Sequence, residues 1–167
     1  FKALMVSAVG IVYISMGLSL IFPLRAIMSN SFIGDIGYTI PLILIITIWV
    51  NDTAAYLVGS LIGRRPLSSI SPNKTWEGTI AGILISVLLV TKIMGQYIPL
   101  NERSILLISM VAAVAGTFGD LVESKLKRLA GVKDSGTMMP GHGGFLDRFD
   151  SILLATPFVW LLIQLVY

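Results

Sequence analysis

Long apolar runs alternate with short polar segments along the whole chain, and five of these runs approach the length needed to cross a membrane. They occupy residues 4–22, 36–62, 75–95, 104–122 and 151–167. A transmembrane helix needs roughly 20 predominantly apolar residues to span a hydrocarbon core about 30 Å thick. The pattern therefore predicts an all-α protein, a polytopic bundle of about five transmembrane helices in which residues 1–167 form a single membrane-embedded unit.

Two features qualify this pattern. The second run is interrupted by the polar triplet at 51–53 and contains Pro41, so we expect part of it to be kinked or buried against protein. The chain opens with Phe1 and shows no basic segment or small-residue cleavage site typical of a signal peptide. We expect it to be the C-terminal, catalytic part of a longer polytopic protein.

Composition supports membrane embedding and removes several kinds of chemistry. Hydrophobic residues make up 55% of the chain and charged residues 13%, and the mean hydropathy is +0.88. These values lie far outside the range of soluble domains. The absence of cysteine excludes thiolate catalysis, disulfides and cysteine-ligated zinc.

The basic residues gather on one side of the predicted membrane. Alternating the five runs leaves only Arg25, Lys92 and Arg103 on the other side. By the positive-inside rule, the side richer in lysine and arginine is cytoplasmic. That side also holds the polar segment 63–78 and the long loop 123–150, so we expect a cytoplasmic catalytic loop.

Four carboxylates fall near one depth at this cytoplasmic side. Asp52 and Asp120 each lie about 16 residues, or roughly 24 Å, into runs that enter from the other side, and Asp147 and Asp150 precede the last run. Carboxylates held in a bilayer cost a few kcal/mol each and tend to pair, face a cavity or serve a function. The plainer alternative is that Asp120 and Glu123, three residues apart, solvate a helix end and that Asp147 and Asp150 favour a helix N-terminus through its dipole.

Oxygen ligands without a histidine or cysteine cluster suit Mg²⁺, which commonly binds one or two carboxylates plus substrate phosphates. We predict Asp120 and Asp147 as the metal ligands, because one ends a helix and the other precedes one. Asp150 lies one helical turn beyond Asp147 and is predicted to support the same ion or a second one.

Cations and glycines adjoin these carboxylates. Lys127, Arg128 and Lys133 precede the glycine-rich stretch 141–144, and Arg148 follows it. Alone, such residues serve as an orientation signal or attract anionic lipid headgroups. Combined with a metal and a glycine-rich loop, they indicate a phosphate site.

The glycines of the loop are Gly141, Gly143 and Gly144. We expect them to adopt positive φ and to let backbone N–H groups approach phosphate oxygens. His142 is a base, a phosphate donor or only a loop residue.

The segment "SKLKRLAGVKDSGTMMPGHGGFLDRFD" at 124–150 resembles the signature of the CDP-diacylglycerol synthases, also called phosphatidate cytidylyltransferases. The matching pattern is S-x-x-K-R, four residues, K-D, and then P-G-H-G-G-x-x-D-R-x-D. The segments "NDTAAYLVG" at 51–59 and "SPNKTWEG" at 71–78 are similar to the same family, so the resemblance covers residues from about 50 to 151.

This resemblance implies the reaction of CTP with phosphatidate to give CDP-diacylglycerol and pyrophosphate, for phospholipid biosynthesis. It implies a Mg²⁺-dependent nucleotidyltransferase that works as a membrane-embedded homodimer, with metal-binding aspartates at Asp120 and Asp147. Both substrates must meet at the membrane surface, so we expect the site to face the cytoplasm. The short loops between the apolar runs favour a bacterial cytoplasmic membrane. A nucleic-acid partner is not expected.

The implied reaction assigns roles to the remaining candidate site residues. A phosphate monoester is already largely dianionic near pH 7, so no strong base is needed, and we assign His142 to hydrogen-bonding a phosphate. The lysines and arginines would neutralise phosphates, and a second metal ion is compatible with this chemistry. Candidate substrate-binding residues are Asp52, Ser71, Asn73, Lys74, Ser124, Gly141, Gly143 and Gly144.

The segment 71–78 can also be explained as the start of a helix, without a role in substrate binding. Thr75, followed by Glu77 and Gly78, does not complete a capping box, which makes capping a weak explanation for this segment.

Two other functional classes fit part of the pattern. A CTP-dependent lipid kinase of the dolichol or phytol type would share the membrane, nucleotide and metal, but would phosphorylate an alcohol and need a base. An ion-coupled transporter could use Asp52 and Asp120 as ion ligands, but it leaves the basic, glycine-rich segment 124–150 unexplained.

Overall fold

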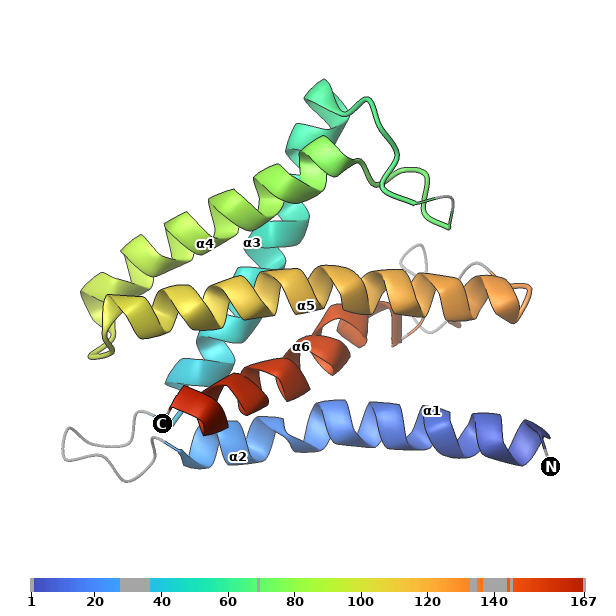
Figure 1. Ribbon diagram of the computed structural model, residues 1–167, viewed down its shortest axis with the longest axis horizontal. Helices are drawn as coiled ribbons and strands as arrows, with labels where there is room; N and C mark the ends of the chain where they lie inside the picture. The colour runs from blue at the N-terminus through green and yellow to red at the C-terminus, as the bar shows by residue number, and fades with distance from the viewer. Residues whose placement is uncertain are drawn as a thin grey trace.

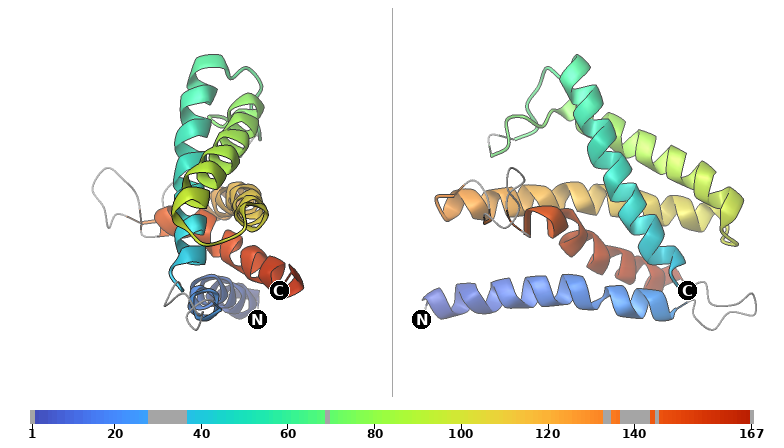
Figure 2. Two further views of the ribbon diagram at one scale, coloured as in Figure 1. Left: turned by 90° about the vertical axis from the view of Figure 1, so that its left-hand side faces the viewer. Right: turned by 180° about the vertical axis from the view of Figure 1, so that it is seen from behind.

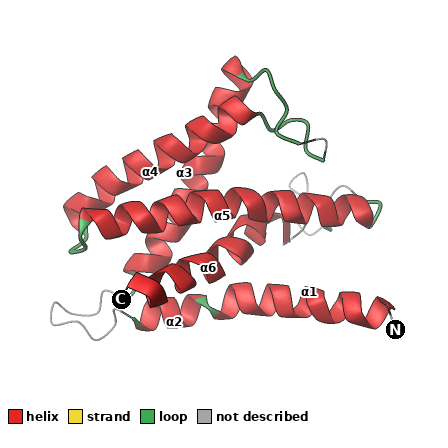
Figure 3. Cartoon of the chain, in the orientation of Figure 1, coloured by secondary structure: helices red, strands yellow, loops and turns green. Residues whose placement is uncertain are grey.

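The computed structural model describes residues 2–27, 37–68, 70–132, 135–136, 144 and 146–166. Within these ranges the chain is helical apart from its connections and one isolated antiparallel β-bridge between Pro66 and Thr75 (Figure 3). The helices in order are α1 (Lys2–Ser19), α2 (Ile21–Ala26), α3 (Thr39–Ile62), α4 (Trp76–Tyr97), α5 (Glu102–Leu129) and α6 (Leu146–Val166).

Four of these helices, α3 to α6, are long and apolar enough to cross a membrane, and a shorter apolar helical stretch covers Gly10–Ala26. The predicted all-α membrane bundle is thereby confirmed for the described residues. The predicted first run, 4–22, corresponds to α1 and the start of α2.

The two prolines near the start of the fold have different effects on their helices. Pro23 has no N–H to donate to the carbonyl of Ser19, and α1 ends at Ser19. Pro41 instead lies in the first turn of α3, where backbone N–H groups have no partner within the helix. α3 is therefore continuous from Thr39 to Ile62, and the polar triplet at 51–53 does not interrupt it.

The fourth apolar run ends at residue 122, but α5 continues to Leu129, so the prediction that Asp120 ends a helix is wrong. Gly131 ends it with a φ of 71°, a conformation that glycine adopts without strain. The N–H of Val132 donates to the carbonyl of Lys127 at 3.0 Å and that of Gly131 to Arg128 at 3.1 Å, which is a Schellman motif. The first part of the predicted loop 123–150 is thus two more helical turns.

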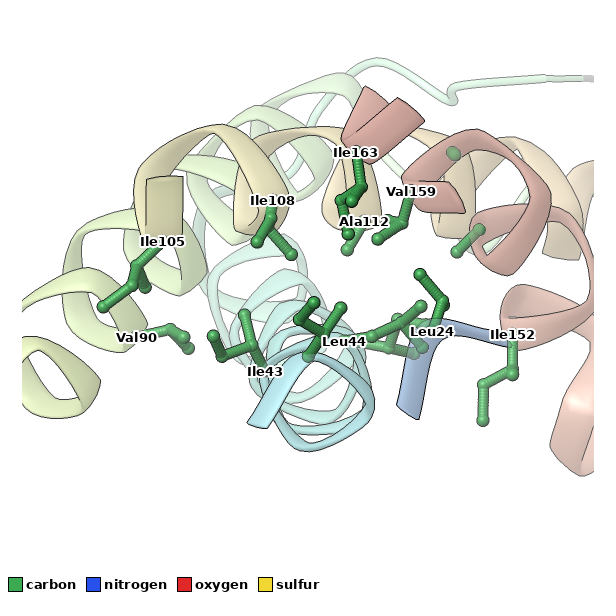
Figure 4. Close-up of a cluster of buried hydrophobic side chains, with 14 residues drawn as sticks. Leu24, Ile43, Leu44, Val90, Ile105, Ile108, Ala112, Ile152, Val159 and Ile163 are labelled. Atoms are coloured by element: carbon green, nitrogen blue, oxygen red, sulfur yellow. The ribbon is translucent and has the colours of Figure 1, made fainter. Parts of the chain in front are cut away.

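α3 packs mainly against α4, and α5 packs mainly against α6, while α1 lies along α6 (Figure 1). Apolar side chains fill the space between α2, α3, α5 and α6, among them Leu24, Ile43, Leu44, Ile108 and Val159 (Figure 4). In a membrane, such contacts hold helices together by close packing rather than by expulsion of water.

Glycines permit the closest helix approaches. A side-chain carbon at Gly78 would lie 2.6 Å from the carbonyl oxygen of Ala55 and 2.8 Å from Cα of Gly59, so α4 touches the backbone of α3 here. At Gly119 it would lie 2.7 Å from the carbonyl oxygen of Asp150, which joins α5 to the first turns of α6. Both contacts require a residue without Cβ.

Most of the polar features of the chain lie toward one side of the bundle. The α3–α4 connection, the C-terminal end of α5 and the N-terminal end of α6 all extend to the same side in two opposite views (Figures 1 and 2). The α4–α5 connection lies at the other side. This arrangement brings together segments that are about 70 residues apart in sequence.

Candidate active site

The α3–α4 connection is held in a defined shape by backbone hydrogen bonds. The N–H of Leu67 donates to the carbonyl of Lys74 at 2.7 Å, and the N–H of Trp76 donates to Arg65 at 3.0 Å. The Glu77 carboxylate accepts hydrogen bonds from the N–H groups of Arg64 and Arg65 at 3.2 and 3.3 Å. These contacts fix the residues just before α4.

Thr75 caps the N-terminus of α4. Its hydroxyl oxygen accepts a hydrogen bond from the N–H of Gly78 at 3.2 Å. We had expected capping to be a weak explanation because no reciprocal glutamate completes a capping box, but a single hydroxyl acceptor is enough to satisfy one N–H at the helix start. The cap therefore exists, and Lys74 directly precedes it.

Lys74 forms an ion pair with Asp120 of α5, at the end of the connection it helps to shape. Ser124, one turn further along α5, donates a hydrogen bond to the other oxygen of Asp120 at 3.3 Å. The Lys74 and Asp120 side chains are 31% and 22% exposed, so this pair is partly shielded from solvent. An ion pair in such a setting is stronger than one on an open surface.

Burial lowers the pKa of the Lys74 ammonium below its ordinary value, and the neighbouring charge of Lys127 acts in the same direction. The carboxylates of Asp52 and Asp150 oppose this shift. Lys74 therefore lies within electrostatic reach of Asp52, Asp120 and Asp150, three of the four carboxylates predicted to share one depth.

A cavity of about 420 Å³ opens beside this ion pair. It is bordered by α3, α4, α5 and the α3–α4 connection, and five of its lining residues were predicted from sequence: Asp52, Ser71, Asn73, Lys74 and Asp120. The wall includes Asn51, Tyr56 and Thr117 as well. Its size is in the range of small-molecule sites.

A second group of charges lies where α5 ends and α6 begins. The Lys127 ammonium is 2.7 Å from a carboxylate oxygen of Glu123 and 2.6 Å from Oδ1 of Asp147. Glu123 is only 1% exposed, and apart from this ion pair its oxygens have no hydrogen-bond partner among the described residues. Lys127 is thus the charge that makes burial of Glu123 tolerable.

The second oxygen of Asp147 is held by the segment between the helices. Oδ2 accepts hydrogen bonds from the N–H of Ser135 at 2.9 Å, the Ser135 hydroxyl at 2.8 Å and the N–H of Gly144 at 2.6 Å. Both oxygens of Asp147 are therefore occupied by protein donors.

Gly144 does not have the positive φ that we expected for the loop glycines; Gly131 is the positive-φ glycine among the described residues. A side-chain carbon at Gly144 would lie 2.6 Å from the backbone nitrogen of Gly136. Gly144 is needed there because two backbone segments touch, and its N–H donates to Asp147.

The close approach of Gly119 to Asp150 places the two groups of charges next to each other, since Asp120 follows Gly119 on α5. Asp120 and Asp147 nevertheless have separate lysine partners, and Asp147 is not among the described residues that line the cavity. Their convergence on one metal ion remains a prediction.

The other predicted residues have the following positions. Arg128 is exposed on α5 and donates to the carbonyl of Val132 at 3.2 Å, and Arg148 is exposed in the first turn of α6. Asp150 lies in the same helix, with Oδ1 accepting the N–H of Ser151 at 2.6 Å. Lys133, Gly141, His142 and Gly143 lie outside the described residues.

Sequence reasoning missed several residues that the structure places in the site, among them Glu123, Asn51 and Thr117. The signal for Glu123 was its spacing of four residues from Lys127, which puts the two side chains on one helix face. Asn51 lies in the polar triplet at 51–53, but neither this triplet nor the sequence around Thr117 indicates their contact, which joins α3 to α5.

The site offers several carboxylates as possible ligands for the expected Mg²⁺. Their oxygen atoms are the donors that this ion prefers, so the chemistry fits. Among the described residues, no three aspartate, glutamate or histidine side chains are grouped closely enough to hold a metal ion by themselves. An ion held by one or two of these carboxylates would take its remaining ligands from water and from substrate phosphates.

A bundle of apolar helices with paired carboxylates and lysines at one side defines a membrane-embedded protein with a polar site. The chain matches the cytidylyltransferase family over residues 1–166, and it belongs to that family.

Curated relatives carry more specific names. The chain is 49% identical over 123 residues to the phosphatidate cytidylyltransferase of Bacillus subtilis (strain 168), covering 72% of this chain and 45% of that protein. It is 48% identical over 119 residues to the phosphatidate cytidylyltransferase of Staphylococcus epidermidis (strain ATCC 12228 / FDA PCI 1200), covering 70% and 45%. It is 45% identical over 120 residues to phosphatidate cytidylyltransferase 4, chloroplastic, of Arabidopsis thaliana, covering 71% and 30%. The chain thus spans less than half the length of these relatives.

Proposed function

We propose that this chain carries the catalytic site of a phosphatidate cytidylyltransferase, which joins CTP and phosphatidate to give CDP-diacylglycerol and pyrophosphate for phospholipid biosynthesis. The observation that carries the proposal is the pairing of Lys74 with Asp120 and of Lys127 with Asp147 beside a cavity of about 420 Å³. The names of the curated relatives support the same reaction.

The reaction brings two polyanions together, so its first requirement is positive charge. Lys74 at the cavity wall and Lys127 next to it are placed to bind phosphate oxygens once they turn from their aspartate partners. Arg128 and Arg148, both exposed near the same end of the bundle, would add further positive charge. The phosphatidate phosphate is already ionised and attacks the α-phosphorus of CTP without needing a base.

We further propose that Asp120 and Asp147 hold Mg²⁺. A bound divalent ion would neutralise charge on the CTP phosphates and on the leaving pyrophosphate. The lysine partners that these carboxylates now have would then be free for phosphate oxygens. Ser124 and Ser135 would keep the carboxylates in place, since each donates its hydroxyl to one of them.

The position of the site at one side of a membrane bundle suits two substrates that meet at an interface. We propose that this side faces the cytoplasm, where CTP is available, as the distribution of basic residues predicts. We also propose a homodimer, as the family resemblance implies, in a bacterial cytoplasmic membrane, which the bacterial relatives support.

The test is to follow two labels through the reaction. The full-length protein in liposomes would receive CTP labelled at the α- or the γ-phosphorus, with phosphatidate and Mg²⁺. The proposal predicts α-label in the lipid, γ-label in pyrophosphate, and neither when the metal is chelated. The γ-label in a lipid alcohol would indicate a kinase, and ion flux without nucleotide would indicate a transporter; either result without CDP-lipid would contradict the proposal.

A further inference from the structure

Glu123 is a buried carboxylate of α5 to which the proposed reaction gives no task. Its side chain is 1% exposed, and the Lys127 ammonium lies 2.7 Å from its Oε2. Apart from this ion pair, neither oxygen has a partner among the described residues. Removing a carboxylate from water is so costly that a buried ion pair is often no more stable than apolar residues of the same volume. Stability alone is therefore a weak reason for a glutamate at this position.

The charge of Glu123 also opposes the binding of phosphates. Asp147 and Asp150 already lie within electrostatic reach of it, and both substrates of the proposed reaction are polyanions. A further carboxylate repels them, unless its task is to hold a cation. The cation that Glu123 contacts is Lys127.

Lys127 is shared between two carboxylates where α5 ends and α6 begins (Figure 1). Its Nζ lies 2.7 Å from Glu123 and 2.6 Å from Oδ1 of Asp147. An ammonium group carries three N–H donors, so it can keep one carboxylate while it changes its other partner.

The two carboxylates differ in how readily they can be displaced. Asp147 is 12% exposed, and its other oxygen accepts hydrogen bonds from Ser135 and Gly144. Glu123 is 1% exposed and has Lys127 as its ion-pair partner. A phosphate oxygen that reaches Lys127 from the more open side therefore replaces Asp147 and leaves the contact with Glu123 intact.

We infer that Glu123 is a positioning residue, which anchors the Lys127 ammonium so that it donates to a phosphate oxygen of a substrate. The spacing of four residues puts both side chains on one face of α5, so the anchor needs no movement of the helices. An anchored lysine has lost much of its rotamer freedom before the phosphate arrives, so less is lost on binding. This inference rests on the proposed cytidylyltransferase function and adds a residue that acts through Lys127.

The experiment measures initial rates of CDP-lipid formation by the full-length protein at varied CTP and at varied phosphatidate. Glu123→Gln keeps the shape of the side chain and removes the charge that holds the ammonium. We expect kcat/KM to fall about 10-fold through a higher KM for the substrate whose phosphate meets Lys127. A higher KM for CTP assigns that phosphate to the nucleotide, and a higher KM for phosphatidate assigns it to the lipid.

Lys127→Met tests whether Glu123 acts through the lysine. In the Lys127→Met background, we expect Glu123→Gln to change kcat/KM less than about twofold, because the lysine that it positions is gone. A merely structural glutamate would lower kcat/KM by the same factor in both backgrounds. The double variant should also unfold at a higher temperature than Lys127→Met, which leaves a buried carboxylate unpaired.

Glu102→Gln is the matched control on the same helix. The Glu102 side chain is 62% exposed, and it pairs with Lys92 at 3.6 Å outside the site. This substitution should change KM for either substrate less than about twofold.

Two results would overturn the inference. One is an unchanged KM for both substrates in folded Glu123→Gln, and the other is an equal loss from this substitution with and without Lys127. If Glu123→Gln does not fold, Glu123→Asp replaces it in the comparison, and a loss that persists in full in the Lys127→Met background overturns the inference. An unmodified protein that forms no CDP-lipid would instead overturn the proposed function itself.

Discussion

At the scale of single residues, two lysine–aspartate pairs form the centre of the candidate site. Lys74 reaches Asp120 from the α3–α4 connection, and Lys127 reaches Asp147 from the last turns of α5. In each pair a phosphate oxygen would compete with the aspartate for the lysine. A metal ion would compete with the lysine for the aspartate. These pairs hold the carboxylates and the ammonium groups in position before substrates arrive.

The contribution of Lys74 can be measured against a lysine elsewhere. We expect Lys74→Met to lower kcat/KM for CTP by about 100-fold or more, since it removes a charge aimed at phosphate oxygens. Lys92→Met is the matched control, because Lys92 is an exposed lysine that pairs with Glu102 at 3.6 Å outside the site. It should change the rate of CDP-lipid formation less than about twofold. Comparable losses in the two variants would mean that Lys74 acts through general charge.

Glu123 allows a residue-scale prediction about stability. Its carboxylate is 1% exposed and pairs with Lys127, whereas Glu102 on the same helix is 62% exposed in its pair with Lys92. We expect Glu123→Gln to reduce the free energy of unfolding by about 1–3 kcal/mol and Glu102→Gln by less than about 1 kcal/mol. Thermal unfolding in detergent would show the difference, and equal small shifts would mean that Glu123 is not held as a buried charge.

At the scale of elements, the helices were largely predictable and their ends were not. The apolar runs located α3, α4 and α6 because the membrane demands about 20 apolar residues from each. The run ending at 122 stopped short of the end of α5, since hydropathy falls at the charged residues 123–128 although Glu, Lys, Leu and Arg are good helix formers. Glycine at 131 was the sequence signal for the true end.

The site was predictable only where a short segment carries several of its residues. Lys127, Asp147 and Lys74 lie in motifs that could be read directly, whereas the partner of each depends on how the helices pack. The link between Asn51 and Thr117 joins residues 66 positions apart. Nothing local in the sequence encodes that contact, which exists because α3 and α5 lie against each other.

The crossing of α3 and α4 leaves no room for a single added methyl group at Gly78. We expect Gly78→Ala to destabilise the protein by about 1–3 kcal/mol, because the new carbon would clash with the backbone of Ala55 and Gly59. Gly10→Ala in α1 is the control, since nothing lies within 4 Å of its added carbon. Its unfolding temperature should stay equal or rise slightly. Similar behaviour of both variants would argue against the tight crossing.

At the scale of the whole molecule, the bundle gathers polar groups from the α3–α4 connection, α5 and α6 at one side (Figure 2). The rest of the described surface is largely apolar and suits contact with lipid. A nucleotide can reach such a site from water, and a phospholipid can reach it from the membrane.

The most direct test of the account is the initial rate of CDP-diacylglycerol formation by the full-length protein with CTP, phosphatidate and Mg²⁺, measured for Asp120→Asn, Asp147→Asn and the control Glu102→Gln. We predict that each aspartate variant, while folded, loses at least about 100-fold in rate, because the charge that holds cations and lysines in the site is gone. Glu102→Gln should keep nearly full activity. Folded aspartate variants with near-normal rates would contradict the assignment of this site.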